Sequence, residues 1–203
     1  MAIQIETEAK FIIPDPATFD ALKSLNQLGD FTLTPAGVQH LTDRYLDTAD
    51  KRLLQAGFAC RLRRVDDQQI LVLKSLTPAT NEIHRRQEIE MAVTEAQPQT
   101  WVENEAKTLV LGIIGQSPLQ TLFTLYQTRH RSYAHFQGRQ VIELSLDKVG
   151  LHRADQVDYL ELEAELIKDG TEVDLTRFVE ALQHWRPLKP DLSTKFERAL
   201  ARV

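Results

Sequence analysis

Charged side chains recur at every second position in several segments of this sequence, and neighbouring charges within a segment often have the same sign. Glu161, Glu163 and Glu165 form one such run, and Arg61 and Arg63 form another. Residues two apart lie on the same face of a β-strand. Like charges side by side repel unless a ligand or a partner strand supplies the opposite charge. Because the planar fork of arginine binds phosphate oxygens in pairs, the pattern predicts a site for a polyanion.

The glutamates of the first and last of these segments could place several carboxylate oxygens at one point. Glu6 and Glu8 stand near the start of the chain, and Glu163 and Glu165 stand near residue 160. Hard oxygen ligands of this kind suit Mg²⁺ or Mn²⁺ and require neither histidine nor cysteine. We therefore expect one or two divalent cations that bridge these carboxylates to the polyanion.

The elements that must position these charges are strands. Eight segments show alternation, a number that can close a barrel, and Gly138 in a three-residue gap predicts a hairpin. Charged faces would then point into a wet interior, and apolar faces would point outward under helices. The plainer interpretation is a sheet with one face in water. The predicted strands are 3–13, 38–46, 58–65, 70–76, 85–93, 122–136, 140–146 and 157–167, and the predicted helices are 17–25, 100–111, 117–121, 174–185 and 193–201.

Composition limits the function classes. The chain has 203 residues and a formal net charge of −5, so a phosphate-rich ligand needs a local group of cations. The net charge and the lack of interleaved basic and aromatic residues disfavour nucleic acid. No apolar run reaches membrane-spanning length, and the first residues lack a basic region followed by an apolar stretch. With a single cysteine, Cys60, the sequence predicts a cytoplasmic protein without a membrane partner.

Several short motifs, in order from about residue 3 to residue 200, resemble those of the CYTH superfamily, also called triphosphate tunnel metalloenzymes. The first is the ExExK pattern of residues 6–10. The others are the YxDT pattern at 45–48, GxxxRxR at 57–63, the lysine strand at 71–74, RxExE at 86–90, RxR at 129–131, the acidic strand end at 146–147, ExExE at 161–165 and the SK–ER helix at 193–198.

The resemblance implies an α+β fold: a closed eight-stranded antiparallel β-barrel that forms a triphosphate tunnel, with helices packed outside. Residues 1–203 would form a single tunnel domain. The pattern is most similar to the bacterial inorganic triphosphatases, which hydrolyse tripolyphosphate to pyrophosphate and phosphate with Mg²⁺ or Mn²⁺. Some of those proteins carry a C-terminal CHAD domain, and the last helix here ends without a Gly or Pro stop. We therefore expect that the chain can be the N-terminal part of a longer protein.

Roles for individual residues follow from the resemblance and from charge. The implied catalytic set is Glu6, Glu8, Lys10, Glu163 and Glu165. The phosphate-binding set is Lys10, Arg61, Arg63, Lys74, Arg86, Arg129, Arg131 and Lys195. The metal ligands are Glu6, Glu8, Glu163, Glu165 and Asp147, with Glu88, Glu90 and Glu161 as further candidates that could instead orient the arginines.

Other polar residues receive weaker assignments. Asp43 and Tyr45 share a face and are expected either to position a phosphate or water or, for the tyrosine, to belong to the core. Arg64 and Arg85 are out of phase and are expected on the surface, as are the histidines, His84 among them.

Two alternatives to inorganic triphosphatase remain open. One is a non-catalytic module that binds polyphosphate or nucleotide, although loss of catalysis should first erode the carboxylates, which are all present. The other is a class IV adenylyl cyclase or a thiamine triphosphatase, which must also hold an organic group. The sequence shows no dedicated base-reading cluster and leaves the oligomeric state open.

Overall fold

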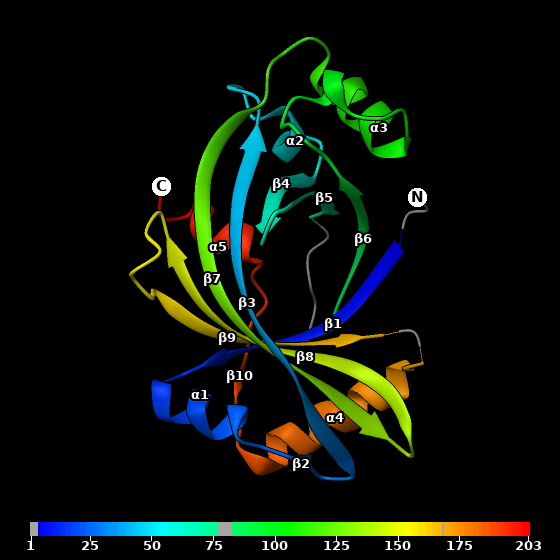
Figure 1. The fold of residues 1–203 in the computed structure, drawn as a ribbon, viewed down its shortest axis with the longest axis vertical. Helices are drawn as coiled ribbons and strands as arrows, with labels where there is room; N and C mark the ends of the chain where they lie inside the picture. Colours follow the sequence, from blue (N-terminus) through cyan, green and yellow to red (C-terminus); the bar gives the residue numbers. More distant parts are fainter. Residues whose placement is uncertain (1–3, 77–82, 168) are drawn as a thin grey trace.

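The computed structural model describes residues 4–76, 83–167 and 169–203, and eight antiparallel strands in this part of the chain close into a barrel (Figure 1). The order around the barrel is β1-β6-β5-β4-β3-β7-β8-β9, and β9 pairs again with β1. This confirms the predicted fold. The strands are β1 (Gln4–Ile13), β3 (Phe31–Asp47), β4 (Phe58–Val65), β5 (Gln68–Ser75), β6 (Ile83–Ala92), β7 (Gln120–Phe136), β8 (Arg139–Leu151) and β9 (Tyr159–Leu166).

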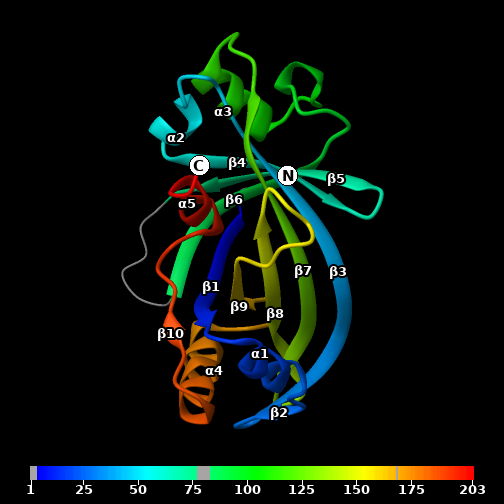
Figure 2. The ribbon, with the colours of Figure 1, turned by 90° about the vertical axis from the view of Figure 1, so that its left-hand side faces the viewer.

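β3 and β7 are the longest strands of the barrel, and they run side by side along the height of the molecule (Figure 2). β3 extends seven residues before the predicted start at residue 38, because the chain continues through an irregularity between Pro35 and Gly37. Gly37 has a φ of 101°, which suits a bulge. Two-residue strands β2 (Gln27–Leu28) and β10 (Lys189–Pro190) add to β3 and β1.

Helices cover the apolar outer faces of the barrel in two groups (Figure 1). α1 (Pro16–Lys23) and α4 (Glu172–Trp185) bury residues such as Phe19 and Phe178 against β1, β8 and β9. At the other end, α2 (Arg52–Gln55) and α3 (Glu105–Ile114) pack on β4, β5 and β6. The outward apolar faces are thus the hydrophobic cores, as the alternation predicts. Among the described residues, no helix combines the length and the apolar character needed to cross a membrane.

One predicted helix is wrong and another begins later than expected. Residues 117–121 are not helical: α3 ends at Ile114, and Gln120 already belongs to β7. The predicted helix 100–111 is a short 3₁₀ turn, η1 (Pro98–Thr100), followed by α3. The break between them has a local cause, because the side chain of Asn104 accepts a hydrogen bond from the backbone N–H of Lys107 and caps α3.

The β7–β8 hairpin sets the register of the inner face. Gln137 and Gly138 both have positive φ, 50° and 79°, as a two-residue hairpin turn of the primed kind requires. This turn, together with a one-residue register shift between Ala134 and His135, aligns Arg129 on β7 with Asp147 on β8. The hairpin predicted from Gly138 is confirmed, and it brings a predicted phosphate ligand opposite a predicted acidic residue.

Candidate active site

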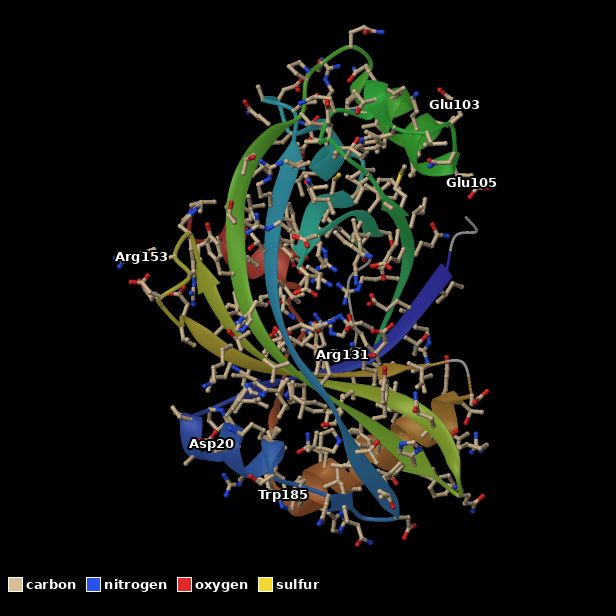
Figure 3. The ribbon with its side chains drawn as sticks, in the orientation of Figure 1. Asp20, Glu103, Glu105, Arg131, Arg153 and Trp185 are labelled. Carbon is tan, nitrogen blue, oxygen red and sulfur yellow. The ribbon has the colours of Figure 1, made fainter. Side chains whose placement is uncertain are left out.

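The inner face of the barrel surrounds a cavity of about 650 Å³. Figure 3 shows Arg131 near the middle of the barrel, whereas Asp20, Glu103 and Arg153 lie at its periphery. Fourteen of the predicted site residues line this cavity: Glu6, Glu8, Lys10, Arg61, Arg63, Lys74, Arg86, Glu88, Glu90, Arg129, Arg131, Glu163, Glu165 and Lys195.

The remaining two predicted residues, Asp147 and Glu161, lie behind this lining. Their exposed fractions are 0% and 1%. Arg64 and Arg85 are exposed, as predicted. The prediction that His84 lies on the surface is wrong, because His84 is 2% exposed and its Nε2 lies 2.9 Å from the carbonyl oxygen of Asp191. His84 shares the inward phase of Arg86 on β6, a signal that the sequence carried.

Closure of the barrel brings the first and last glutamate runs together. β1 pairs with β9 so that Glu8 stands opposite Glu165 and Lys10 opposite Glu163. On its other edge, β1 places Glu6 opposite Arg86 of β6. Residues more than 150 positions apart in the chain therefore share one wall of the cavity. Alternation alone predicts the face of each residue, and only closure makes these residues neighbours.

We call Glu6, Glu8 and Glu165 the carboxylate cluster. Lys74 Nζ lies 2.7 Å from Glu6, and Arg86 pairs with Glu8. Glu165 makes no ion pair with a described residue. Burial and the nearby Glu6 and Glu8 carboxylates together raise the pKa of Glu165 to about 8. At this point three carboxylates face two cations, Lys74 and Arg86.

The charge and the donor atoms of the carboxylate cluster fit a divalent cation. Its donor set is carboxylate oxygen, which Mg²⁺ and Mn²⁺ prefer. A bound cation would supply the positive charge that Glu165 lacks and would offset the repulsion that raises its pKa. Glu6, Glu8 and Glu165 would hold it. Glu88 lies nearby and pairs with Lys74 at 3.2 Å.

A second acidic group, Asp147, Glu161 and Glu163, is already neutralised by side chains. Oxygen atoms of these three residues lie within 4.8 Å of one another, close enough to hold a metal. However, the Lys195 ammonium lies 3.1 Å from Asp147 and 2.7 Å from Glu163, and it also pairs with Glu161. We call these four residues the Lys195 cluster. Its ammonium stands where a metal would stand.

Two more cations complete the neutralisation of the Lys195 cluster. Lys10 Nζ lies 2.6 Å from Glu163, and Arg129 pairs with both Asp147 and Glu163 at 2.6 Å. Burial opposes charge on Glu163, but Lys10, Lys195 and Arg129 outweigh it and hold its pKa well below the usual range. For Glu161, burial dominates and raises the pKa to about 7. Three carboxylates thus face three cations.

The C-terminal helix α5 (Lys195–Leu200) places Lys195 in the cavity. The side chain of Thr194 caps the helix, and Glu197 completes a capping box. Phe196 packs between Tyr45 and Phe123, with ring centroids 5.4 and 5.7 Å away. Tyr45 therefore belongs to the core and also lines the cavity. The aromatic contacts fix α5 across one end of the tunnel.

A third feature was only partly visible in the sequence: a buried aspartate behind two arginines. Both carboxylate oxygens of Asp43 accept hydrogen bonds from Arg63 at 2.8 Å, and Asp43 also lies 3.4 Å from Arg61. Gln127 Nε2 donates to the same carboxylate at 2.7 Å. Burial would raise the pKa of Asp43, but Arg63 and Arg61 hold it below its usual range. Glu143, another residue outside the predicted site, lines the cavity and pairs with Arg131 at 2.7 Å.

Comparison with known proteins agrees with this geometry. The CYTH domain family matches residues 4–200. No curated protein matches the chain.

Solved structures share the fold at low sequence identity. A candidate adenylyl cyclase from Hippeastrum, described as having a dominant triphosphatase activity, has a TM-score of 0.71 at 19% identity and covers 97% of this chain and 96% of its own. A candidate adenylate cyclase from Bacillus halodurans has a TM-score of 0.69 at 21% identity, covering 98% of both chains. The capping enzyme triphosphatase of Mimivirus has a TM-score of 0.51 at 13% identity, covering 88% of each chain.

Proposed function

This chain belongs to the CYTH domain family, and we propose that it hydrolyses inorganic triphosphate inside its barrel with the help of a divalent cation. The products would be pyrophosphate and phosphate. One observation carries the proposal: eight lysine and arginine side chains line the same cavity as the carboxylate cluster. An anion with many charges and a hard cation are the pair of ligands that such a lining complements.

The cationic side chains would act on the charge of the phosphates. Phosphoryl transfer needs little covalent help from a protein, so catalysis rests on positioning and on stabilisation of charge. Arg61, Arg63 and Arg129 would hold phosphate oxygens through paired N–H groups. Lys10 stands between the carboxylate cluster and the Lys195 cluster, 3.7 Å from Glu8 and 2.6 Å from Glu163. On this proposal it would contact substrate phosphate beside the cation.

A cation held by Glu6, Glu8 and Glu165 would neutralise phosphate oxygens and lower the pKa of a water molecule. No side-chain nucleophile is needed. Cys60 belongs to the apolar cluster outside the barrel rather than to the cavity lining, and burial raises the pKa of its thiol to about 12. The thiol is therefore neither accessible nor ionised near neutral pH.

A phosphate-release screen tests the proposal. Tripolyphosphate, ATP, thiamine triphosphate, pyrophosphate and long-chain polyphosphate would each be incubated with the protein in Mg²⁺, in Mn²⁺ and in chelator. We expect rapid release from tripolyphosphate that stops in chelator. Tight binding without release would instead support a non-catalytic module. Cyclic AMP and pyrophosphate from ATP would support an adenylyl cyclase, and preferred release from thiamine triphosphate would support an organic triphosphatase.

A further inference from the structure

The cations that line the cavity differ in how fully the protein neutralises them. Lys10, Arg129 and Lys195 face the three carboxylates of the Lys195 cluster. Lys74 and Arg86 face Glu6, Glu88 and Glu8, and Arg131 faces Glu143. By contrast, Arg61 and Arg63 share a single carboxylate, that of Asp43. Among the described residues, this wall of the cavity alone keeps an excess positive charge.

The two arginines also keep unused hydrogen-bonding capacity. Arg63 uses Nε and one terminal nitrogen on Asp43, which leaves its remaining N–H groups for a ligand. Arg61 approaches Asp43 only at 3.4 Å, and its Nε has no partner among the residues that the structure describes. Their strand neighbours on β5, Ile70 and Val72, are apolar, and on β3 the Tyr45 side chain takes one hydrogen bond from Arg61. A phosphate group would meet donors that no carboxylate has saturated.

Asp43 itself is closed off from any ligand. It is 0% exposed and does not line the cavity. Its register position opposite Arg63, on the neighbouring strand β3, fixes its carboxylate behind the guanidinium group. Gln127 of β7 donates to Asp43 from the other side. Asp43 therefore acts on its surroundings only through the orientation of the two arginines.

We propose that Asp43 is a positioning residue that holds Arg61 and Arg63 as the first anchor of the triphosphate, an inference that rests on the proposed function. The bidentate bond sets the rotamer of Arg63 before substrate arrives, and Gln127 fixes the carboxylate in turn. The other cations must first release their own carboxylates or share them with a metal. Arg61 and Arg63 can bind phosphate without that exchange.

Substitution of Asp43 by asparagine separates positioning from charge. The change removes a negative charge beside the anion site, so simple electrostatics predicts tighter binding of tripolyphosphate. Loss of orientation predicts weaker binding, because residues that fix a ligand-binding group typically contribute about 10–100-fold. We expect tripolyphosphate affinity to fall about tenfold in Asp43→Asn, with the turnover defect in KM rather than kcat.

Calorimetric titration with tripolyphosphate in chelator measures this without the metal. Glu172→Gln is the matched control, because Glu172 makes the same bidentate bond to Arg85 on the outer surface. It should bind as the unsubstituted protein does. Gln127→Met keeps every charge and should also weaken tripolyphosphate binding, by a smaller factor than Asp43→Asn. If Asp43→Asn does not fold, Gln127→Met tests the inference in its place.

Unchanged or tighter binding by Asp43→Asn, or by Gln127→Met where that variant decides, would overturn the inference while the proposed function stands. If the unsubstituted protein binds tripolyphosphate only with Mg²⁺, the inferred metal-independent anchor is wrong while the proposed function stands. If it neither binds nor hydrolyses tripolyphosphate with Mg²⁺ or Mn²⁺, the proposed function fails and the inference fails with it.

Discussion

At the scale of single residues, two groups of carboxylates of similar composition have opposite surroundings. In the carboxylate cluster, Glu165 faces other carboxylates, and its pKa is raised by burial and by Glu6 and Glu8. In the Lys195 cluster, an ammonium occupies the point where the oxygen atoms converge. Carboxylate spacing along a strand does not distinguish these cases. The neighbouring cations distinguish the two groups, and on the proposed function the carboxylate cluster would hold the metal.

This difference predicts the effect of removing Glu165. Glu165→Gln should lower Mn²⁺ affinity and the turnover of tripolyphosphate by about 100-fold, because even partners behind a metal ligand contribute about 10–100-fold. Titration of Mn²⁺ and steady-state phosphate release would measure both quantities. Full metal-dependent turnover in Glu165→Gln and in Glu8→Gln would contradict the assignment of the cation site.

Arg63 and Arg64 are adjacent in sequence but face opposite sides of β4. Arg63 lines the cavity, whereas Arg64 is exposed outside. Arg63→Ala should raise KM for tripolyphosphate by about tenfold, since a hydrogen bond to a charged group contributes about 1.5–3 kcal/mol. Arg64→Ala serves as the control and should leave KM unchanged. Equal KM values for the two variants would remove Arg63 from the substrate site.

The ion pairs of Asp43 predict a pH dependence of stability. Arg63 and Arg61 hold the pKa of Asp43 below its unfolded value of about 3.9, so its stabilisation is complete above that value and falls as the pH drops through it. The difference in unfolding free energy between the unsubstituted protein and Asp43→Asn should shrink by about 1 kcal/mol from pH 5 to pH 3. Urea unfolding at both pH values measures it, and a constant difference would show that folding does not lower the pKa of Asp43.

At the scale of elements, backbone geometry at a few turns sets which side chains meet. The β7–β8 turn and the register shift beside it keep Arg129 opposite Asp147, and the Thr194 cap starts α5 where Lys195 reaches the cavity. Asp47 plays a similar part at the end of β3, because its carboxylate accepts hydrogen bonds from the backbone N–H groups of Leu53 and Leu54. The acidic residue of the YxDT pattern is thus structural.

Two glycine substitutions test this view with opposite signs. Gly138→Ala places a side chain at a φ of 79° and should lower the free energy of unfolding by about 1–2 kcal/mol. Gly112 lies within α3 with open space around an added Cβ, so Gly112→Ala should raise that free energy by about 0.5–1 kcal/mol. Chemical unfolding of both variants measures the pair. The same sign for both would refute the turn geometry.

Period-two alternation predicted the strands and their inner faces well, because a strand with one polar and one apolar face alternates polar and apolar residues in sequence. It failed where the backbone departs from regular structure. Alternation does not predict the start of β3, which lies before the Pro35–Gly37 irregularity. It also does not exclude a helix at residues 117–121, where the structure has none. The pairing of Asp43 with Arg63 depends on register between strands, which no single strand encodes.

At the scale of the whole molecule, an overall acidic chain concentrates cations inside a closed surface. The formal net charge is −5, yet eight lysine and arginine side chains line one cavity. Lys10, Arg86 and Lys195 are nearly fully buried, which strengthens the interaction of their charges with a ligand. The fold therefore provides a polyanion site that the net charge conceals.

Binding inside the barrel should stabilise the whole domain. At 100 times its dissociation constant, tripolyphosphate would add about 2.7 kcal/mol to the free energy of unfolding. For a domain of this size, that corresponds to a rise in Tm of about 5–10 °C. Thermal unfolding with tripolyphosphate, compared with sulfate at equal ionic strength, measures the effect. An equal shift with sulfate would indicate general anion binding instead of a triphosphate site.

The position of a bound metal tests the central claim most directly, namely that the carboxylate cluster and the arginines of the cavity share one substrate. Crystals grown with Mn²⁺ and tripolyphosphate would locate the metal by its anomalous scattering. We predict a peak beside Glu6, Glu8 and Glu165, with phosphate density reaching Arg61 and Arg63. A Mn²⁺ peak on the outer surface of the barrel, with no phosphate density in the cavity, would contradict the account.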